Sequence, residues 1–555
     1  MRPLATPVKR TVSHGEVAIV VAISMAALFF KLFLLYQRSL YIDTDEGYYL
    51  ILAHNILGGW GLTLNGLPNI VFPPVLPLAI ALLDFLLGKP QLSLMIITAV
   101  SGTLLGLLVY LIARKRWAFL PSIGCLVFTL FLNELNSFLP TSTDYTRILY
   151  RGSDILNCLL IFAAVYFAIR LMEHGRYSLA VLAAAFLALA YLTRPEAFLL
   201  FAAMLGLLCL LKWSSIISLS YKKLACFFFV FLMLSFPYLF YLKKVTGQWT
   251  LSGKISASQK YRTALLDVIE QEDWAEFNRI HYALNRQATE MNDTYFGYHR
   301  QSDRPGETAS MSIMQRAKSN LSLYWIVPKV LFALPFLPLF ILGLAISVRS
   351  VLKRKSISDA ALLILLPYSV LIEALSYPIP RHHLFLVPLM VFLSFEAGVF
   401  LAQKLSPRSI PGQQKMMILM IAVLFALTVN GYITSTGENL MQKPAFAAAR
   451  QTEYTLAQRL REKGASVIMS TYPGIAVWAS ADWQVLPQAP LPDILRFGRR
   501  KKVDYIILPV EKRLFFRVLD LRDSDIPRDL EDNLEFQVLE QGEFYDFVRV
   551  VKKEQ

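Results

Sequence analysis

The densest group of chemically capable side chains follows the first apolar run, where Asp43, Asp45 and Glu46 place three carboxylates within four residues. Carboxylates so close repel one another at a membrane boundary, and their charge costs free energy unless a cation, a metal or a substrate compensates it. The stretch 50–57 that follows has near-helical apolar spacing, as in a short helix lying on a bilayer. The pattern marks a candidate site, with a solvated acidic turn as the alternative.

Two further polar turns carry acids close to a hydroxyl or a base. Ser153 and Asp154 open an apolar run, and Asp154 either joins a site or caps the helix that follows by accepting from its free N–H groups. Arg194 and Glu196 flank Pro195 between two other apolar runs, where proline suits the first turn of a helix. Both turns supply candidate site residues, and a purely structural role is the alternative for each.

Arg381 precedes His382 and His383 at the start of a late apolar run. The forked donors of arginine suit a phosphate, aided by a helix N-terminus, and interfacial anchoring is the alternative. Neighbouring histidines on a helix point about 100° apart, so they do not easily hold one metal ion. The first-loop carboxylates could hold a divalent ion, but no cage of six or more oxygens is visible. No cofactor is therefore predicted, and a divalent metal stays open.

Composition indicates that a membrane protein positions these residues. The chain has 555 residues, 55% of them hydrophobic and 17% charged, with a mean hydropathy of +0.47. Soluble domains carry about a quarter charged residues, and disordered chains are less hydrophobic, so both classes are excluded. The net charge of +15 lies in short basic runs between apolar segments, a topological pattern that predicts no nucleic-acid partner. The four cysteines lie in or beside apolar runs and predict no disulfide framework.

A membrane-spanning helix needs about 20 mostly apolar residues. Eleven segments meet this requirement: 16–36, 92–113, 117–134, 153–173, 178–193, 196–213, 224–242, 325–348, 359–378, 381–402 and 415–433. The apolar segment 72–88 is shorter and contains several prolines and Asp84, so we expect a re-entrant or interfacial element there. The predicted fold class is a polytopic α-helical membrane protein of about eleven spans.

Basic residues predict the orientation of these spans. With the N-terminus in the cytoplasm, the inner loops hold 18 Lys and Arg residues and the short outer loops hold 6. Such a bias is typical of cytoplasmic loops. The bias predicts that the N-terminus lies inside, and we expect the protein in the plasma (inner) membrane. The polar regions 37–91, 243–324 and the tail from 434 then share the outer face.

The polar tail predicts a second domain. Residues 1–433 form the transmembrane domain, and 434–555 form a small extracytoplasmic α/β domain. The tail alternates between helical and strand-like patterns. The expected elements are helices at 444–463 and 491–500 and strands at 467–470, 503–509, 535–540 and 544–551.

Several of these motifs together resemble the GT-C membrane glycosyltransferases, in the branch of the protein O-mannosyltransferases and the lipid A aminoarabinose transferase. The motif from Asp45 to Tyr49 is similar to the acidic first-loop motif of that family, and 72–78 is similar to its proline-rich segment. The Ser153-Asp154 pair, the turn 192–196 and Arg381 with its flanking prolines also match. The resemblance covers residues 16–435 closely and the tail loosely.

The resemblance implies transfer of a sugar from a polyprenyl-phosphate donor to a protein, lipid or glycan acceptor at the outer face. Asp45 would be the catalytic acidic residue, supported by Glu46, and Arg381 with Arg194 would bind the donor phosphate. Supporting roles fall to Asp43, Asp154, Glu196 and His382. Asp43 does not map onto the family pattern, and the double histidine replaces an expected tyrosine.

Transport is the competing function. A transporter or flippase of a lipid-linked sugar would also gather charged groups at one membrane face, without covalent chemistry. However, transporters usually place ionisable groups near the bilayer midplane. Near the midplane this chain offers Lys31, Glu373 and Glu396, which are few for an ion-coupled pathway and favour the enzyme.

Overall fold

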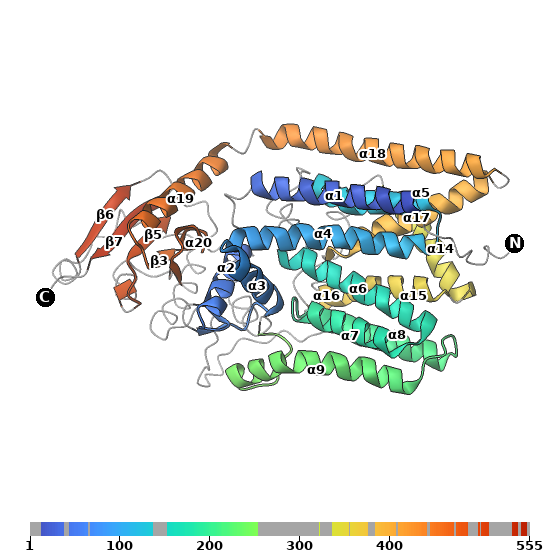
Figure 1. Cartoon of the computed structure of the whole chain (residues 1–555), viewed down its shortest axis with the longest axis horizontal. Helices are drawn as coiled ribbons and strands as arrows, with labels where there is room; N and C mark the ends of the chain where they lie inside the picture. Colours follow the sequence, from blue (N-terminus) through green and yellow to red (C-terminus); the bar gives the residue numbers. More distant parts are fainter. Residues whose placement is uncertain are drawn as a thin grey trace. The chain divides into compact units, whose positions relative to one another are not determined.

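Apolar helices dominate the part of the chain that the computed structural model describes (Figure 1). The described residues are 13–37, 44–64, 67–136, 152–253, 321, 336–354, 356–375, 383–406, 409–440, 444–470, 473–486, 498–499, 501–509, 535–541 and 545–551. The chain forms two compact units. Unit 1 consists of Met1–Gln37, Leu94–Tyr238 and Met311–Gln442, and unit 2 consists of Arg38–Ser93, Leu239–Ser310 and Lys443–Gln555.

Unit 1 is a helical bundle, and among the described residues each predicted span overlaps a helix or a helix pair. Residues 325–335 of the predicted span 325–348 lie outside the described part of the chain. A helix satisfies every backbone hydrogen bond within the segment, as the interior of a bilayer requires. The helices that lie wholly or largely in this unit are α1 (His14–Gln37), α4 (Pro90–Arg114), α5 (Phe119–Asn136), α6 (Gly152–His174), α7 (Tyr177–Tyr191), α8 (Ala197–Trp213), α9 (Tyr221–Thr246), α14 (Leu337–Arg354), α15 (Ile357–Leu363), α16 (Leu365–Leu375), α17 (Leu386–Leu405) and α18 (Ile410–Leu440).

Fewer helices than eleven meet a strict criterion for crossing a membrane. In the described chain, seven segments are long and apolar enough: they lie on α1, α4, α6, α9, the α15–α16 pair, α17 and α18. The apolar parts of α5, α7 and α8 are shorter, and α14 has three basic residues within its last six. The polytopic helical class is therefore confirmed, and the number of eleven spans stays a prediction.

Helices of this bundle pack with their backbones close together. Helices α6, α7 and α8 lie side by side (Figure 1), and α7 buries the small side chains of Ala180, Ala183 and Ala184. Helices α14 and α17 also pack together, and a Cβ atom added at Gly343 would collide with the backbone of Leu393. Small residues permit such contacts between membrane helices, where van der Waals packing holds the bundle together.

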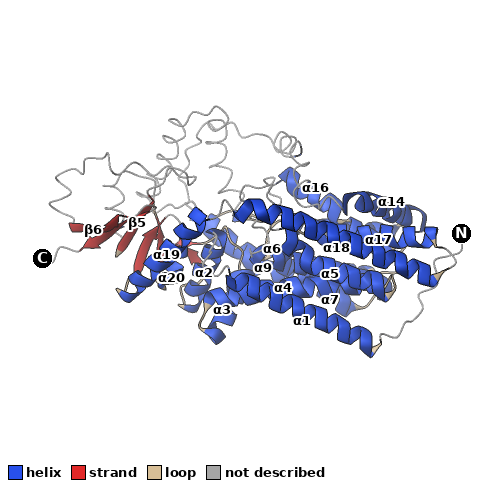
Figure 2. Ribbon diagram, turned by 90° about the horizontal axis from the view of Figure 1, so that it is seen from above, coloured by secondary structure: helices blue, strands red, loops and turns tan. Residues whose placement is uncertain are grey.

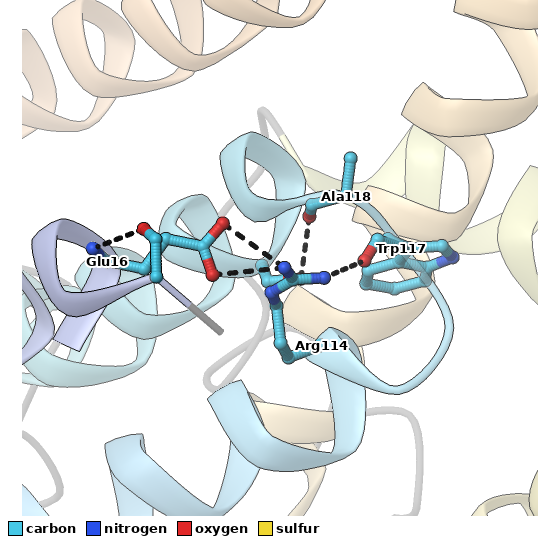
Figure 3. Close-up of polar contacts among 6 residues, drawn as sticks. Glu16, Arg114, Trp117 and Ala118 are labelled. Atoms are coloured by element: carbon cyan, nitrogen blue, oxygen red, sulfur yellow. Dashed lines mark hydrogen bonds and ion pairs between the residues drawn. The ribbon is translucent and has the colours of Figure 1, made fainter. Parts of the chain in front are cut away.

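A basic loop between α4 and α5 links several helices of unit 1. Arg114 donates to both carboxylate oxygens of Glu16 on α1, at 3.1 and 3.0 Å, and to the carbonyl of Trp117 at 3.2 Å (Figure 3). Lys115 donates to Glu173 on α6 at 2.8 Å. The third cation of the loop is held in the same way by α15 and α17. Arg114, Lys115 and Arg116, which predicted a cytoplasmic loop, thus also connect helices of the bundle.

Arg116 is that third cation. Its guanidinium pairs with Asp359 at the start of α15 and lies 3.4 Å from Glu396 on α17. Burial alone would lower the pKa of Arg116, but Glu396 and Asp359 together raise it above its usual value. The arginine therefore stays charged between two acids, and Glu396 is accounted for by this contact.

Unit 2 begins with the two helices of the first polar loop. Helix α2 (Thr44–Leu57) leads to the short strands β1 (Thr63–Leu64) and β2 (Leu67–Pro68), which are antiparallel. Helix α3 (Val75–Leu87) follows and packs against α2. Its 13 residues extend only about 20 Å, less than the roughly 30 Å of a bilayer core. This length agrees with the prediction that 72–88 is not an ordinary span.

The C-terminal part of unit 2 is an α/β fold, in which helices and a sheet lie together (Figure 2). The described elements are α19 (Pro444–Glu462), β3 (Val467–Ser470), α20 (Gly474–Ala479), β4 (Asp482–Val485), β5 (Tyr505–Pro509), β6 (Glu535–Gln541) and β7 (Tyr545–Val551). The sheet order is β4-β3-β5-β7-β6. Strand β3 is parallel to β4 and β5, and β7 is antiparallel to β5 and β6.

The predicted tail elements agree with the observed ones at α19, β3, β5, β6 and β7. The sequence did not predict α20 and β4, and most of the predicted helix 491–500 lies outside the described residues. The last boundary between the two units follows Gln442, whereas the sequence predicted one domain boundary, after residue 433. Unit 2 also gathers much of the three polar regions that were predicted to share one face.

Candidate functional site

The first-loop acids lie in the first turn of α2, in unit 2. Asp45 and Glu46 occupy this turn, where the partial positive charge of a helix N-terminus favours negative side chains. Asp45 is partly exposed, whereas Glu46 is buried, with 8% of its surface accessible. Asp43 lies outside the described residues. The structure therefore presents two adjacent acids at a helix start, one of them accessible.

Aromatic rings support this turn. Tyr48 and Tyr49 both contact Phe72, with ring centroids 5.3 and 5.1 Å apart. Tyr48 also meets the edge of Trp483 on β4, at 5.3 Å. Both tyrosines and the tryptophan are buried. Aromatic pairs in such tilted and edge-on arrangements are favourable beyond the area that they bury. The residues that follow the acidic turn, Tyr48 and Tyr49, are thus packed against Phe72, and Tyr48 also against Trp483.

Hydrogen bonds fix the segment that carries Phe72. The fully buried Asn69 accepts from the backbone N–H groups of Val71 and Phe72, both at 3.2 Å, and donates to the carbonyl of Phe72 at 2.7 Å. Tyr241, at the end of α9, donates to the Asn69 carbonyl at 2.8 Å. A buried amide that satisfies both its donor and its acceptor specifies one local conformation. Asn69 therefore holds Phe72 in place beneath α2.

A second contact between α2 and β4 is more exposed. His54 Nε2 lies 4.0 Å from Asp482 Oδ1, and the two side chains are 60% and 35% exposed. Burial raises the pKa of the Asp482 carboxyl above its ordinary 3.8, and the nearby His54 opposes this shift. Ion pairs this exposed contribute little to stability. The contact between Tyr48 and Trp483 is thus the firmer link between the helix and the sheet.

In unit 1, Asp154 and Arg194 form a buried ion pair. Asp154 lies in the first turn of α6, and its carboxylate contacts Arg194 Nη1, whereas Arg194 Nε lies 3.8 Å from Glu196. The three side chains are 1%, 10% and 14% exposed, in that order. Among the described residues, neither oxygen of Asp154 has a hydrogen-bond partner, so the structure favours ion pairing over the capping role.

A third polar group links α16 to the start of α17 within unit 1. His383 Nδ1 lies 2.7 Å from Ser369 Oγ, and its Nε2 lies 3.1 Å from Glu373 Oε2. All three residues are fully buried. The sequence did not predict this group, although Ser369 and Glu373 are four residues apart on one helix and so share a face. Arg381 and His382 lie outside the described residues.

No group of three or more His, Cys, Asp or Glu side chains is arranged to hold a metal ion in the described part of the chain. The carboxylates of unit 1 are matched instead by basic side chains, as Asp154 is by Arg194 and Asp359 by Arg116. What the described residues offer is the acidic turn of unit 2 and, in unit 1, the Asp154–Arg194 ion pair and the buried group of Ser369, His383 and Glu373.

The sequence of residues 71–241 matches the family described as dolichyl-phosphate-mannose-protein mannosyltransferase. The matched segment contains Asp154, Arg194 and Glu196, begins after Asp45 and Glu46, and ends before Arg381. A comparison of the sequence with curated proteins finds no match.

Solved structures of two membrane enzymes are similar to this chain. The oligosaccharyltransferase of Archaeoglobus fulgidus in its apo form is 13% identical, with a TM-score of 0.53 over 89% of this chain and 70% of that one. ArnT from Cupriavidus metallidurans in the apo state is 12% identical, with a TM-score of 0.54 over 98% of this chain and 99% of that one. ArnT bound to undecaprenyl phosphate has a TM-score of 0.51 at 12% identity, over 98% and 100%.

At sequence identities this low, the structural similarity shows the fold alone. Both similar proteins are GT-C glycosyltransferases, so the predicted GT-C architecture is confirmed. The apolar helices and this fold together make the chain an integral membrane protein.

Proposed function

We propose that this chain is a membrane glycosyltransferase that moves a sugar from a polyprenyl-phosphate-linked donor to an acceptor at the outer face of the membrane. The observation that carries the proposal is the match of residues 71–241 to a mannosyltransferase family, in a chain with the GT-C fold. The structures of ArnT with undecaprenyl phosphate and of the Archaeoglobus enzyme AglB with a dolichol-phosphate support this class of donor.

Transport without covalent chemistry has less support. The matched family is a family of transferases. Moreover, ionisable groups within the bundle have structural partners: Lys31 donates to the Leu130 carbonyl at 2.8 Å, Glu373 meets His383, and Glu396 lies beside Arg116. A transporter keeps such groups on its pathway near the midplane.

Asp45 is the proposed catalytic acid residue. It would accept the proton of the acceptor hydroxyl as the acceptor oxygen bonds to the anomeric carbon of the sugar. The bond from that carbon to the phosphate oxygen breaks, and the polyprenyl phosphate leaves with the electron pair. Glu46 supports the negative field at this helix start, which also stabilises positive charge developing on the sugar. Asp43 stays a supporting residue by its place in the sequence.

Arg381 is the proposed ligand of the donor phosphate, with His382 beside it in the sequence. A guanidinium offers two parallel N–H donors to a phosphate and stays charged at every physiological pH. Arg194 is the second predicted ligand, but Asp154 and Glu196 already neutralise it. We therefore assign the phosphate primarily to Arg381 and propose that Asp154 and Glu196 hold Arg194 in place.

The proposed orientation places the N-terminus in the cytoplasm and unit 2 outside the plasma (inner) membrane. A chain without its four native cysteines can carry one new cysteine at an exposed serine of either unit. Ser480→Cys in unit 2 should react with an impermeant thiol reagent in intact cells, and Ser214→Cys, in the α8–α9 loop of unit 1, should not. Labelling of Ser214→Cys alone would invert the orientation.

The decisive experiment incubates the purified protein with a panel of polyprenyl-phosphate sugars and with protein, lipid and glycan acceptors. Release of polyprenyl phosphate together with a new glycosidic product supports the proposal and identifies both substrates. Movement of the intact donor across vesicles of known lipid composition, with no release of carrier phosphate, would replace the enzyme by a transporter.

A further inference from the structure

We propose that Trp483, on the C-terminal sheet, is a positioning residue for the Asp45–Glu46 turn, and that it sets the turnover of the enzyme without touching substrate. The inference rests on the proposed function, because it assigns a residue to the same reaction. It begins from the contact between Tyr48 and Trp483, whose ring centroids are 5.3 Å apart within unit 2.

The indole of Trp483 is fixed to the sheet. Its Nε1–H donates to the carbonyl of Ser470 at 3.1 Å and to the hydroxyl of the same residue at 3.2 Å. Ser470 ends β3, which pairs with β4 in parallel register. The side chain is 2% exposed. A buried ring with its one polar atom bonded to the neighbouring strand has little freedom to move.

Tyr48 connects the fixed Trp483 ring to helix α2. It follows Asp45 by three residues, so the two side chains leave the helix on nearly the same face. The Tyr48 ring is 2% exposed. Its plane makes an angle of 61° with the Trp483 ring and of 33° with the Phe72 ring. Helix α2 is therefore held at Tyr48, one turn after its acids, between Phe72 of the first loop and Trp483 of the sheet.

The two supports come from different parts of the sequence. Phe72 belongs to the first loop and is held by Asn69, whereas Trp483 belongs to the tail. Helix ends fray unless side chains fix them. A reacting group displaced by about 1 Å can cost on the order of 10²-fold in rate. Loss of the Trp483 ring should therefore act on turnover more than on donor binding.

The test compares two substitutions that both remove the indole N–H and both leave a smaller side chain. Trp483→Phe keeps an aromatic edge for Tyr48, and Trp483→Leu does not. We expect Trp483→Leu to lower kcat by about 10- to 100-fold with the donor KM unchanged, and Trp483→Phe to keep most of the turnover. His54→Gln, which alters the exposed contact between the same two elements, should leave kcat unchanged.

The complementary change comes from the helix. Tyr48→Leu should lower kcat as much as Trp483→Leu does, and the double variant should be no slower than either single one, because both remove the same contact. Additive losses would contradict a shared mechanism. A Trp483→Leu chain that does not fold would also contradict the proposal, since the ring would then hold the sheet rather than the helix.

The inference and the proposed function fail in different ways. No glycosyl transfer by the wild type, with any donor of the panel, overturns the proposed function. An active wild type and a Trp483→Leu variant with full kcat overturn the inference alone. If Trp483→Leu lowered kcat and raised the donor KM by the same factor, the inference would also be overturned. The same holds if Trp483→Phe lowered kcat as much as Trp483→Leu does.

Discussion

Two groups of carboxylates in this protein occupy contrasting surroundings. In unit 2, Asp45 is partly exposed at the start of α2, above packed aromatic rings. In unit 1, Asp154 is buried against Arg194. A buried carboxylate in an ion pair has its charge committed to its partner, whereas an accessible one can exchange a proton with a bound molecule. Substitutions in unit 2 should therefore change rate, and those in unit 1 should change stability.

The largest expected effect is that of Asp45→Asn, which keeps the shape and removes the charge. Loss of a general base typically lowers the rate by about 10²–10⁴-fold, and the unfolding temperature should hardly change because the side chain is partly exposed. Release of polyprenyl phosphate measures the rate. Asp482→Asn, the same substitution elsewhere in unit 2, is the control. Equal turnover by Asp45→Asn and wild type would remove Asp45 from the catalytic assignment.

Arg194→Ala tests the other half of the comparison. It leaves the carboxylate of Asp154 buried without its cation, and an uncompensated buried charge typically costs about 3–5 kcal/mol of stability. Thermal unfolding in detergent measures the loss. Arg176→Ala, at the exposed start of α7, should have little effect. Unchanged unfolding of Arg194→Ala would mean that the pair is not structural, and Arg194 would regain its place as a phosphate ligand.

Substitutions of Arg381 should have a smaller effect, which is confined to the affinity for the donor. Arg381→Lys keeps the charge but loses the two parallel donors, and Arg381→Ala loses both. Donor affinity should fall in the order Arg, Lys, Ala, with a charge-assisted contact worth about 1.5–3 kcal/mol. Protection from thermal unfolding by the polyprenyl-phosphate sugar measures it. An anchoring arginine predicts full protection in Arg381→Lys, since lysine reaches the interface about as well.

The smallest effect concerns Asp482 and pH. Burial raises the pKa of Asp482 above 3.8 in the folded chain, so the folded state keeps a proton that the unfolded state releases. Stability is therefore lost as the pH rises from about 4 through the raised pKa. In a His54→Gln background, which removes the side chain that opposes the shift, Asp482→Asn should become relatively more stable as the pH rises across this range. A pH-independent difference in unfolding temperature would contradict the assigned pKa direction.

Hydropathy and local motifs predicted much of this architecture. Runs of apolar residues located the helices of unit 1, and the helical spacing at 50–57 located the later part of α2, which begins earlier, at Thr44. Strand-like apolar runs located β3 and β5 in the tail. These features depend on residues that are close in the sequence, where spacing alone determines the signal. The turn 192–196 was likewise found as a motif, although its ion pair with Asp154 was not.

Contacts between distant segments could not be predicted in the same way. Strand β4 is only four residues long and begins with a charged residue, so it has no clear pattern. Trp483 therefore had no signal, and its contact with Tyr48 depends on how the sheet packs. The same holds for His383, which meets Ser369 and Glu373 only once α17 packs against α16. Tertiary packing decides such pairs, and a single sequence does not display it.

The contact between Tyr48 and Trp483 joins residues separated by most of the chain. A ribosome makes α2 early and β4 late, and contacts so distant in sequence form slowly. The acidic turn therefore receives its last support only after the whole sheet has been synthesised and folded. During biogenesis, a partly made transferase would hold its acids without this support, so full turnover would begin with the completed chain.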